Sequence, residues 1–231
     1  MKEIDFAEYI TGLTTGFSPV LGGIPEEDYA QIDLSSGNPV LASVDLTSME
    51  AFSEFMKQFL KETGRKVAIG GYMEIRKLYE RSELFNDPDD PDNSRNIHMG
   101  MDLWADLHTP VLAVLDGKIH SLKDNDNFGD YGPTVILEHQ VSGHCFYTLY
   151  GHLSKRSLEG LKVGQVIKGG TKLAELGGPS ENGDYFPHLH FQIIQDMKGE
   201  IGDFPGVVSK NELEEYIRLC PDPNLLLKIK P

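Results

Sequence analysis

The chain has 231 residues, with 21 Lys and Arg against 36 Asp and Glu, and its formal net charge is −15. Because a nucleic-acid-binding protein needs a basic face to neutralise phosphates, this charge argues against a nucleic-acid partner and against any other strongly anionic partner. Hydrophobic residues make up 39 % of the chain, which indicates a globular protein with a buried core. No run approaches the roughly 18 apolar residues of a membrane helix, so we expect no membrane span.

The first residues and the cysteines predict a compartment. Glu3, Asp5 and Glu8 interrupt the apolar run that a secretory signal requires, so no signal peptide is expected. Cys145 and Cys220 are too few for a disulfide framework. They are expected to be free, mostly buried thiols, with a single bridge between them as the alternative. Together these features predict a cytoplasmic protein.

Residues 1–94 are expected to form an N-terminal α/β extension. Its clearest element is an amphipathic helix that begins at the capping-box pattern of Thr47 and Glu50 and ends at Gly64. The Asp-rich stretch 86–94 holds two prolines and no apolar residue. We interpret it as a solvated loop rather than a calcium loop, since the alternating ligand pattern of a calcium loop is missing.

Residues 96–195 consist of short apolar or alternating runs divided by Gly, Asn and Asp, without a long helix between them. This texture predicts a mostly β fold built on an antiparallel sheet. The predicted strands are 97–103, 111–115, 134–139, 146–150, 172–176 and 189–194. The tail, residues 201–231, is expected to add a short helix that follows a second capping box at Ser209 and Glu212 and ends before Pro221.

Histidines fall at positions where strand alternation brings polar side chains to one face. In the strand 97–103, His98 and Asp102 share a face, and Gly100 between them leaves space there. The same alternation groups His188 with His190, and His152 follows another predicted strand. Two His and one carboxylate are a common catalytic zinc set. These five residues exceed that number, so a closed structural zinc and a catalytic zinc with an open position both remain possible.

Six blocks of the sequence resemble, in the same order, those of the LytM/lysostaphin-type zinc metalloendopeptidases, a family of peptidoglycan metallopeptidases. The resemblance covers about residues 95–195 and implies a lysostaphin-like zinc metallopeptidase core over 95–200. The blocks are HMGMD (98–102), TPVLAVLDG (109–117), DYG (130–132), YGHLS (150–154), LKVGQ (161–165) and PHLHF (187–191).

The resemblance also implies roles for the five residues. In the family, the first His, the Asp and the second His of the His-x-His pair bind Zn²⁺, and these positions are His98, Asp102 and His190 here. The remaining pair, His152 and His188, is expected beside a metal-activated water as general base and transition-state stabiliser, and either could be the base. The implied reaction is hydrolysis of a peptide bond in a peptidoglycan-type peptide or a muropeptide.

Two further blocks, GYMEIR (71–76) and GDFPG (202–206), look like those of a subgroup found fused to aminotransferase or kinase modules. Most family members are exported, whereas this chain is expected to stay in the cytoplasm. Two alternatives are therefore kept: a cytoplasmic hydrolase of a non-wall peptide or amide, and a non-catalytic regulatory LytM-like module. Arg76 and Arg95 are expected to form ordinary ion pairs, with binding of a substrate carboxylate as the alternative. No oligomeric state is predicted.

Overall fold

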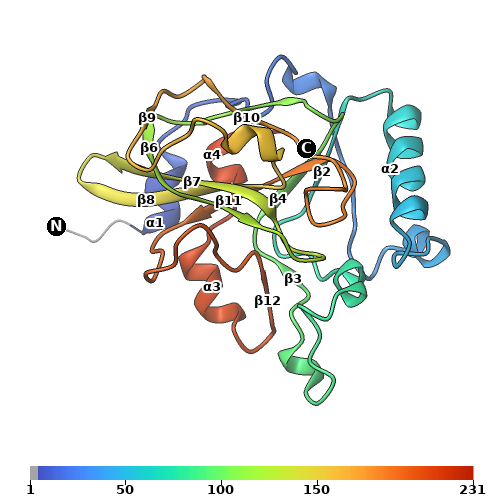
Figure 1. Cartoon of the computed structure of the whole chain (residues 1–231). Helices are drawn as coiled ribbons and strands as arrows, with labels where there is room; N and C mark the ends of the chain where they lie inside the picture. Colours follow the sequence, from blue (N-terminus) through green and yellow to red (C-terminus); the bar gives the residue numbers. More distant parts are fainter. Residues whose placement is uncertain (1–4, 231) are drawn as a thin grey trace.

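The structure, a computed structural model, describes residues 5–230. Its main sheet contains β1 (Tyr29–Gln31), β2 (Val67–Gly70), β4 (Met101–Trp104), β6 (Gly117–Asn125), β7 (Gly132–Val141), β8 (His144–Gly151), β9 (Val166–Ile167) and β11 (His188–Ile194). The strand order is β1-β2-β4-β11-β8-β7-β6-β9 (Figure 1). Every neighbouring pair is antiparallel except β1 and β2. The predicted mostly β class with an antiparallel sheet is therefore confirmed.

Two small sheets and several short helices complete the fold. The sheets pair β5 (Pro110–Leu112) with β10 (Lys172–Glu175) and β3 (Ile97–His98) with β12 (Val207–Val208). The α-helices are α1 (Phe6–Thr11), α2 (Met49–Thr63), α3 (Leu213–Leu219) and α4 (Asn224–Leu227). The described 3₁₀ helices are η1 (Glu26–Asp28), η2 (Pro39–Ser43), η3 (Lys77–Arg81), η4 (Pro91–Asn93) and η5 (Lys155–Leu158). The short C-terminal helix was predicted, whereas α4 was not.

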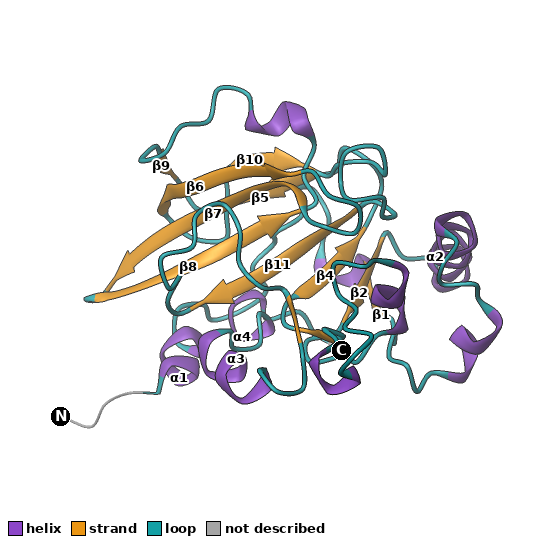
Figure 2. Ribbon diagram, turned by 60° about the horizontal axis from the view of Figure 1, so that its bottom comes forward, coloured by secondary structure: helices purple, strands orange, loops and turns teal. Residues whose placement is uncertain are grey.

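One face of the main sheet carries the largest core. Alternate side chains of its central strands, such as Leu103, Leu189 and Phe191, are buried against the β5–β10 sheet and against α1 and α4. The helices α1 and α4 thus pack on the same face, and Figure 2 shows them close together beside the sheet. Burial of this apolar surface is the main stabilising contribution to such a fold. The opposite face of β4 and β11 carries Trp104 together with the polar side chains of Asp102, His188, His190 and Gln192.

The helix α2 packs beside that opposite face, beyond the edge strand β1 (Figure 2). Its buried Phe52 and Met56 contact a cluster that includes Trp104 of β4. The predicted helix is confirmed, but its N-cap is Ser48, whose Oγ accepts a hydrogen bond from the backbone N–H of Ala51 at 3.2 Å. Thr47 instead bonds the side chain of Asp45.

The predicted single strand 97–103 is wrong, because the structure divides it into β3 and β4, which belong to different sheets. The break falls at Met99 and Gly100, where the backbone N–H of Met99 bonds the carbonyl of Gly206. The strand β6 was not predicted. Its sequence, GKIHSLKDN, offers few apolar side chains, and the strand is held by pairing with β7 over nearly its whole length.

Both cysteines are free thiols, so the bridge does not form in this structure. Cys220 is buried as expected, but Cys145 is exposed, which corrects the expectation that both are mostly buried. Across residues 5–230, no helix has both the length and the apolar character needed to cross a bilayer. The predicted lack of a signal peptide rests partly on Glu3, which lies outside the described residues.

Candidate metal and catalytic site

The site lies where β4, β11 and the end of β8 meet. The antiparallel register of β11 with β4 sets His190 directly opposite Asp102 and His188 opposite Trp104. On its other side, His190 pairs with Gly151, the last residue of β8, and His152 follows at once. Side chains directly opposite in a sheet lie within about 5 Å of one another. The sheet register therefore gathers residues that are up to 88 positions apart in the chain.

His98, Asp102 and His190 form a tight buried cluster. The Nε2 atom of His98 lies 2.9 Å from Nδ1 of His190, and each of these nitrogens lies 3.2 Å from Oδ1 of Asp102. One ligand atom from each residue therefore falls within 4.8 Å of the others. All three residues are at most 3 % exposed. Two imidazole nitrogens and a carboxylate oxygen are the donor types that Zn²⁺ prefers in catalytic sites.

Neighbouring carbonyl oxygens determine where the protons of the two imidazoles lie. Nδ1 of His98 donates to the carbonyl of Gly71 at 3.0 Å, and Nε2 of His190 donates to Oε1 of Gln192 at 2.9 Å. The amide orientation of Gln192 is itself fixed, because its Nε2 donates to the carbonyl of Pro205 at 3.1 Å. With their protons outward, both histidines turn lone pairs toward the Asp102 oxygen. Three acceptors that face one another in this way fit a cation between them.

Gly100 makes this convergence possible. A Cβ atom at this position would lie 2.5 Å from Nε2 of His190 and 3.0 Å from the carbonyl oxygen of Phe191. Any side chain there would have to displace the imidazole or the strand β11. The space noted in the sequence at Gly100 is thus occupied by the ring of His190, and it is closed to a larger residue.

A buried ion pair holds the outer oxygen of Asp102. Arg76, only 1 % exposed, donates from Nη1 to Oδ2 of Asp102 and from Nε to Glu74 at 2.8 Å. Burial opposes ionisation of Asp102, but the neighbouring His98, the charge of Arg76 and hydrogen bonds from His190 and His98 outweigh it, so the pKa of Asp102 lies well below its usual range. The predicted ordinary ion pair of Arg76 is confirmed. Its partner is the carboxylate of the cluster itself.

His152 and His188 lie side by side next to this cluster. Their ring centroids are 4.1 Å apart, and Nε2 of His188 is 4.0 Å from Oδ1 of Asp102. Each donates from Nδ1 to a backbone carbonyl at 2.8 Å, His152 to Asn182 and His188 to Phe186. Both therefore keep an unprotonated Nε2. Burial lowers the pKa of His188 to about 4, and burial together with the neighbouring His188 and His190 lowers the pKa of His152 well below its usual value.

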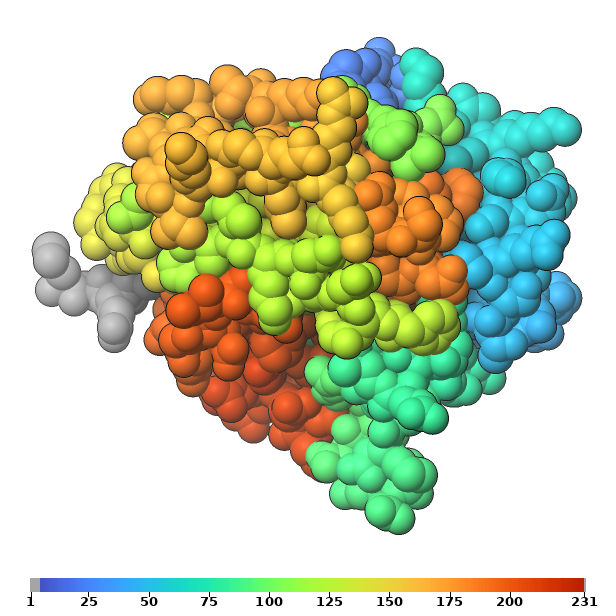
Figure 3. Space-filling view, viewed as in Figure 1, coloured from blue at the N-terminus to red at the C-terminus, as the bar shows by residue number. Residues whose placement is uncertain are grey.

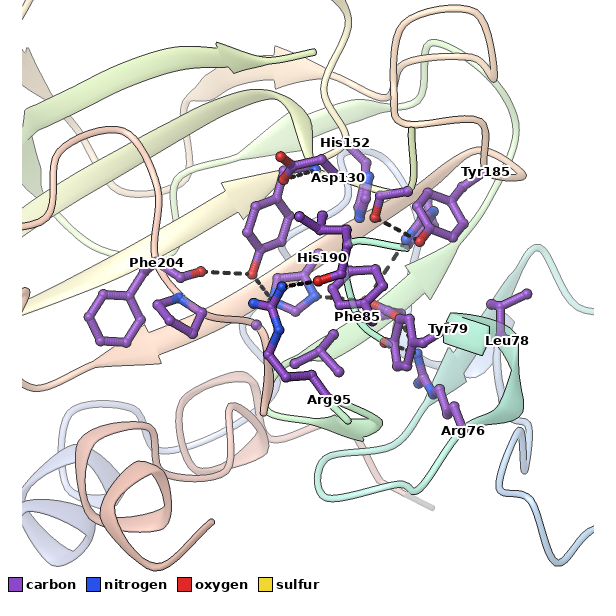
Figure 4. A pocket seen from close by; sticks show the side chains of 18 of the residues that line it. Arg76, Leu78, Tyr79, Phe85, Arg95, Asp130, His152, Tyr185, His190 and Phe204 are labelled. Carbon is purple, nitrogen blue, oxygen red and sulfur yellow. Dashed lines mark hydrogen bonds and ion pairs between the residues drawn. The ribbon is translucent and has the colours of Figure 1, made fainter. Parts of the chain in front are cut away.

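A cavity of about 240 Å³ opens onto these side chains. Asp102, His152, His188 and His190 line its floor, and Figure 4 shows residues from distant parts of the chain pointing into the same space. One wall comes from residues 78–95, which belong to the N-terminal extension except for Arg95, and another from residues 200–207. The site thus combines a candidate cation-binding cluster with two neutral imidazoles at the bottom of one small pocket.

The structure brings together all five residues singled out from the sequence. Sequence reasoning missed four partners that orient them: Gly71, Gln192, Asn182 and Phe186. Gln192 shares strand parity with His188 and His190, and that parity was the available signal. The other three act through backbone carbonyls, which no residue type reveals. The other histidines lie outside the pocket, and His139 is buried between the carbonyl of Asp116 and the hydroxyl of Thr148.

The buried histidines predict a pH effect on the metal-free protein. Burial lowers the pKa of His98, His139, His152 and His188 below 6.5. The unfolded chain therefore takes up protons below about pH 6.5 that the folded chain does not, and stability is lost as the pH falls through this range. We expect the thermal unfolding midpoint in a chelator to be lower at pH 5.5 than at pH 7. An equal or higher midpoint at pH 5.5 would contradict this sign.

Comparison with known proteins agrees with this geometry. Residues 96–201 match the peptidase family M23. An uncharacterized metalloprotease of Buchnera aphidicola subsp. Baizongia pistaciae (strain Bp) is 32 % identical over 122 residues, which cover 51 % of this chain and 29 % of that protein. Lysostaphin of Staphylococcus staphylolyticus is 33 % identical over 96 residues, covering 42 % of this chain and 18 % of that protein.

Among solved structures, a zinc-containing peptidase from Vibrio cholerae is 31 % identical with a TM-score of 0.35, over 42 % of this chain and 27 % of that one. The chain thus spans less than a third of the curated relatives that it matches. Residues 96–201, the part of the chain that matches peptidase family M23, carry all five site residues.

Proposed function

We propose that this protein is a zinc-dependent metallopeptidase. The observation that carries the proposal is the convergence of three unprotonated ligand atoms, from His98, Asp102 and His190, beside the two neutral imidazoles of His152 and His188. All of these residues but His98 line one pocket. The match of residues 96–201 to peptidase family M23 and the metalloprotease relative support the same class of enzyme. The complete ligand set disfavours a non-catalytic module.

His98, Asp102 and His190 would hold the zinc ion through Nε2, Oδ1 and Nδ1. A bound zinc lowers the pKa of a water ligand to ~7 and polarises the carbonyl of the scissile bond. The protein keeps these three atoms in place through Gly71, Gln192 and Arg76, which bond the far side of each ligand. Such outer partners orient the ligands and typically account for about 10- to 100-fold in metal affinity.

His152 and His188 would move the proton. A neutral Nε2 of either residue can accept a proton from water, and the other can stabilise charge that develops on the carbonyl oxygen. Because the two rings are 4.1 Å apart and buried, only one of them can carry a charge at a time. The proton that one ring accepts is then available for the amine that leaves. Either residue can be the base in this scheme.

For the substrate we propose a peptide of the peptidoglycan type or a muropeptide, on the basis of the sequence blocks and the lysostaphin relative. The test combines two measurements on the purified protein. Elemental analysis is expected to find about one zinc per chain, and digestion of peptidoglycan, muropeptides and small amides side by side is expected to release new amines from peptide bonds. A protein that binds no zinc and cuts none of these would contradict the proposal, and cleavage of small amides alone would contradict the substrate class.

A single methyl group at Gly100 is expected to disrupt the zinc site. In Gly100→Ala, the new Cβ would overlap the ring of His190, so this ligand must move. We expect zinc affinity, measured by competition with a chelator, to fall by about 10- to 100-fold. Gly16→Ala is the matched control, because no atom lies within 4 Å of its Cβ position. Unchanged zinc affinity in Gly100→Ala would show that His190 does not bind the ion.

A further inference from the structure

The segment 77–96, here called the lid, forms one wall of the pocket, although all but its last residue lies outside the region that matches peptidase family M23. Arg81 in the lid pairs with Asp184 at 3.0 Å and lies over the ring of Tyr185. Ser82 donates a hydrogen bond to the carbonyl of Phe128 at 3.0 Å. The lid is therefore bound to two separate loops, around Phe128 and around Asp184, and Figure 3 shows the three segments packed together on one face.

The lid also packs against β12, through apolar side chains. Tyr79 and Phe85 form a small apolar cluster with Val207 of β12, and their rings are 5.1 Å apart. Three separate parts of the fold thus hold the lid across the site. A long polymer that passed through the site would have to leave through this wall. The pocket volume of about 240 Å³ is below the range typical of drug-sized ligands, which suits the end of a short chain.

Arg95, at the end of the lid, lines this pocket and has no carboxylate within 4.0 Å among the described residues. Its guanidinium donates to the carbonyl of Leu84 and lies 5.1 Å from the ring centre of Phe85, and its backbone N–H bonds the carbonyl of Phe85 at 2.8 Å. These contacts hold the side chain but leave its charge without a partner.

The two arginines of the pocket therefore differ in what they can bind. Arg76 is occupied by Asp102 and Glu74, whereas Arg95 is free to pair with an anion from outside. In Figure 4, Arg95 lies below the ring of His190 and Asp130 lies above it. Asp203, another acid of the pocket, has its pKa raised by burial and by the charge of Asp130. Asp130 and Asp203 repel an anion, so Arg95 is the position in the pocket lining at which a carboxylate fits. A planar guanidinium binds a carboxylate through two parallel hydrogen bonds.

We propose that Arg95 binds the free C-terminal carboxylate of a short peptide, so that the protein cuts peptide bonds close to a C-terminus rather than inside a polymer. This inference rests on the proposed peptidase function and names its substrate class. Hydrolysis breaks the C–N bond, adds the hydroxyl of water to the acyl carbon and transfers a proton to the released amine. The lid limits the length of the released piece, and the carboxylate on Arg95 sets which bond reaches the imidazoles.

The test compares matched substrates. Two short N-acetylated peptides, one ending in Gly-Gly and the other in D-Ala-D-Ala, are each prepared as the free acid and as the C-terminal amide. We expect the zinc-loaded protein to cut a free acid with a kcat/KM about tenfold or more above that of its amide. Arg95→Ala should remove this preference by slowing the free acid alone, and Arg95→Lys should retain part of it.

Arg65→Ala is the matched control, because Arg65 is also an arginine that donates to a backbone carbonyl, that of Glu27, but it does not line the pocket. Its preference should equal that of the original protein. Equal cleavage of acid and amide, an equal slowing of both by Arg95→Ala, or faster cleavage of intact peptidoglycan than of either free acid would overturn the inference and leave the peptidase function standing.

A second readout does not depend on turnover. Calorimetry with the same peptides and the His188→Ala protein, whose turnover we expect to be slow, measures binding of acid and amide directly. The free acid should bind about tenfold or more tightly, and the additional change Arg95→Ala should abolish the difference. If no peptide is cut but this difference is found, the carboxylate site stands and the peptidase function fails. Equal binding of acid and amide overturns the inference in every case.

Discussion

His188→Ala is expected to lower kcat by about 10²- to 10⁴-fold while the protein retains about one zinc per chain. The residue is buried in the pocket wall and turns an unprotonated Nε2 toward Asp102. It stands apart from the three-atom cluster, whose members lie within 4.8 Å of one another. Its loss should therefore remove a proton acceptor without removing a ligand. The measurements are steady-state kinetics on a cleaved peptide and zinc content by elemental analysis.

Two further substitutions sharpen this result. His190→Ala should lose zinc and activity together, because it removes one of the converging nitrogens. His108→Ala replaces an exposed histidine outside the pocket and should change neither quantity. If His188→Ala lost its zinc while His190→Ala kept it, the two histidines would have exchanged roles, and the ligand assignment proposed above would be wrong.

The positions of the histidines on β11 were predictable because strand alternation depends only on a period of two. His188, His190 and Gln192 lie on one face of β11, and Leu189, Phe191 and Ile193 face the main core. The sequence did not reveal that Asp102 would stand opposite His190. That pairing depends on the register between β4 and β11, which lie far apart in the chain and are aligned by tertiary packing.

The lid shows the other limit of sequence reasoning. Its residues have no regular apolar period, and their structure depends on contacts with remote loops, such as that between Arg81 and Asp184. The same holds for β2, which joins the extension to the main sheet by pairing with β4. The division into an extension (1–94), a core (95–200) and a tail (201–231) remains a prediction about the chain, since the flanking parts also contribute strands and pocket walls. Local sequence patterns were enough to predict the candidate zinc ligands. The shape of the pocket depends on contacts between residues far apart in the chain, which the sequence alone does not show.

Arg76→Met is expected to reduce the free energy of unfolding of the metal-free protein by about 3–5 kcal/mol, the usual cost when one partner of a buried ion pair is removed. The substitution leaves the outer oxygen of Asp102 buried without its cation, and Glu74 loses the same partner. Urea denaturation in a chelator measures the loss. Arg218→Ala is the matched control, since it breaks an exposed pair with Glu214 and should change stability by less than about 0.5 kcal/mol.

Zinc distinguishes the two ways in which Arg76 could stabilise the fold. If its charge balances Asp102, a bound zinc supplies positive charge beside the same carboxylate, so the loss in Arg76→Met should be smaller in saturating zinc than in the chelator. If Arg76 acts mainly by packing, its guanidinium 5.5 Å from the ring centre of Trp104, the loss should be the same in both conditions. Because Arg76 pairs with Asp102, we expect the smaller loss in saturating zinc. In the metal-free protein, Arg76 would then supply the positive charge beside Asp102 that zinc supplies when it is bound.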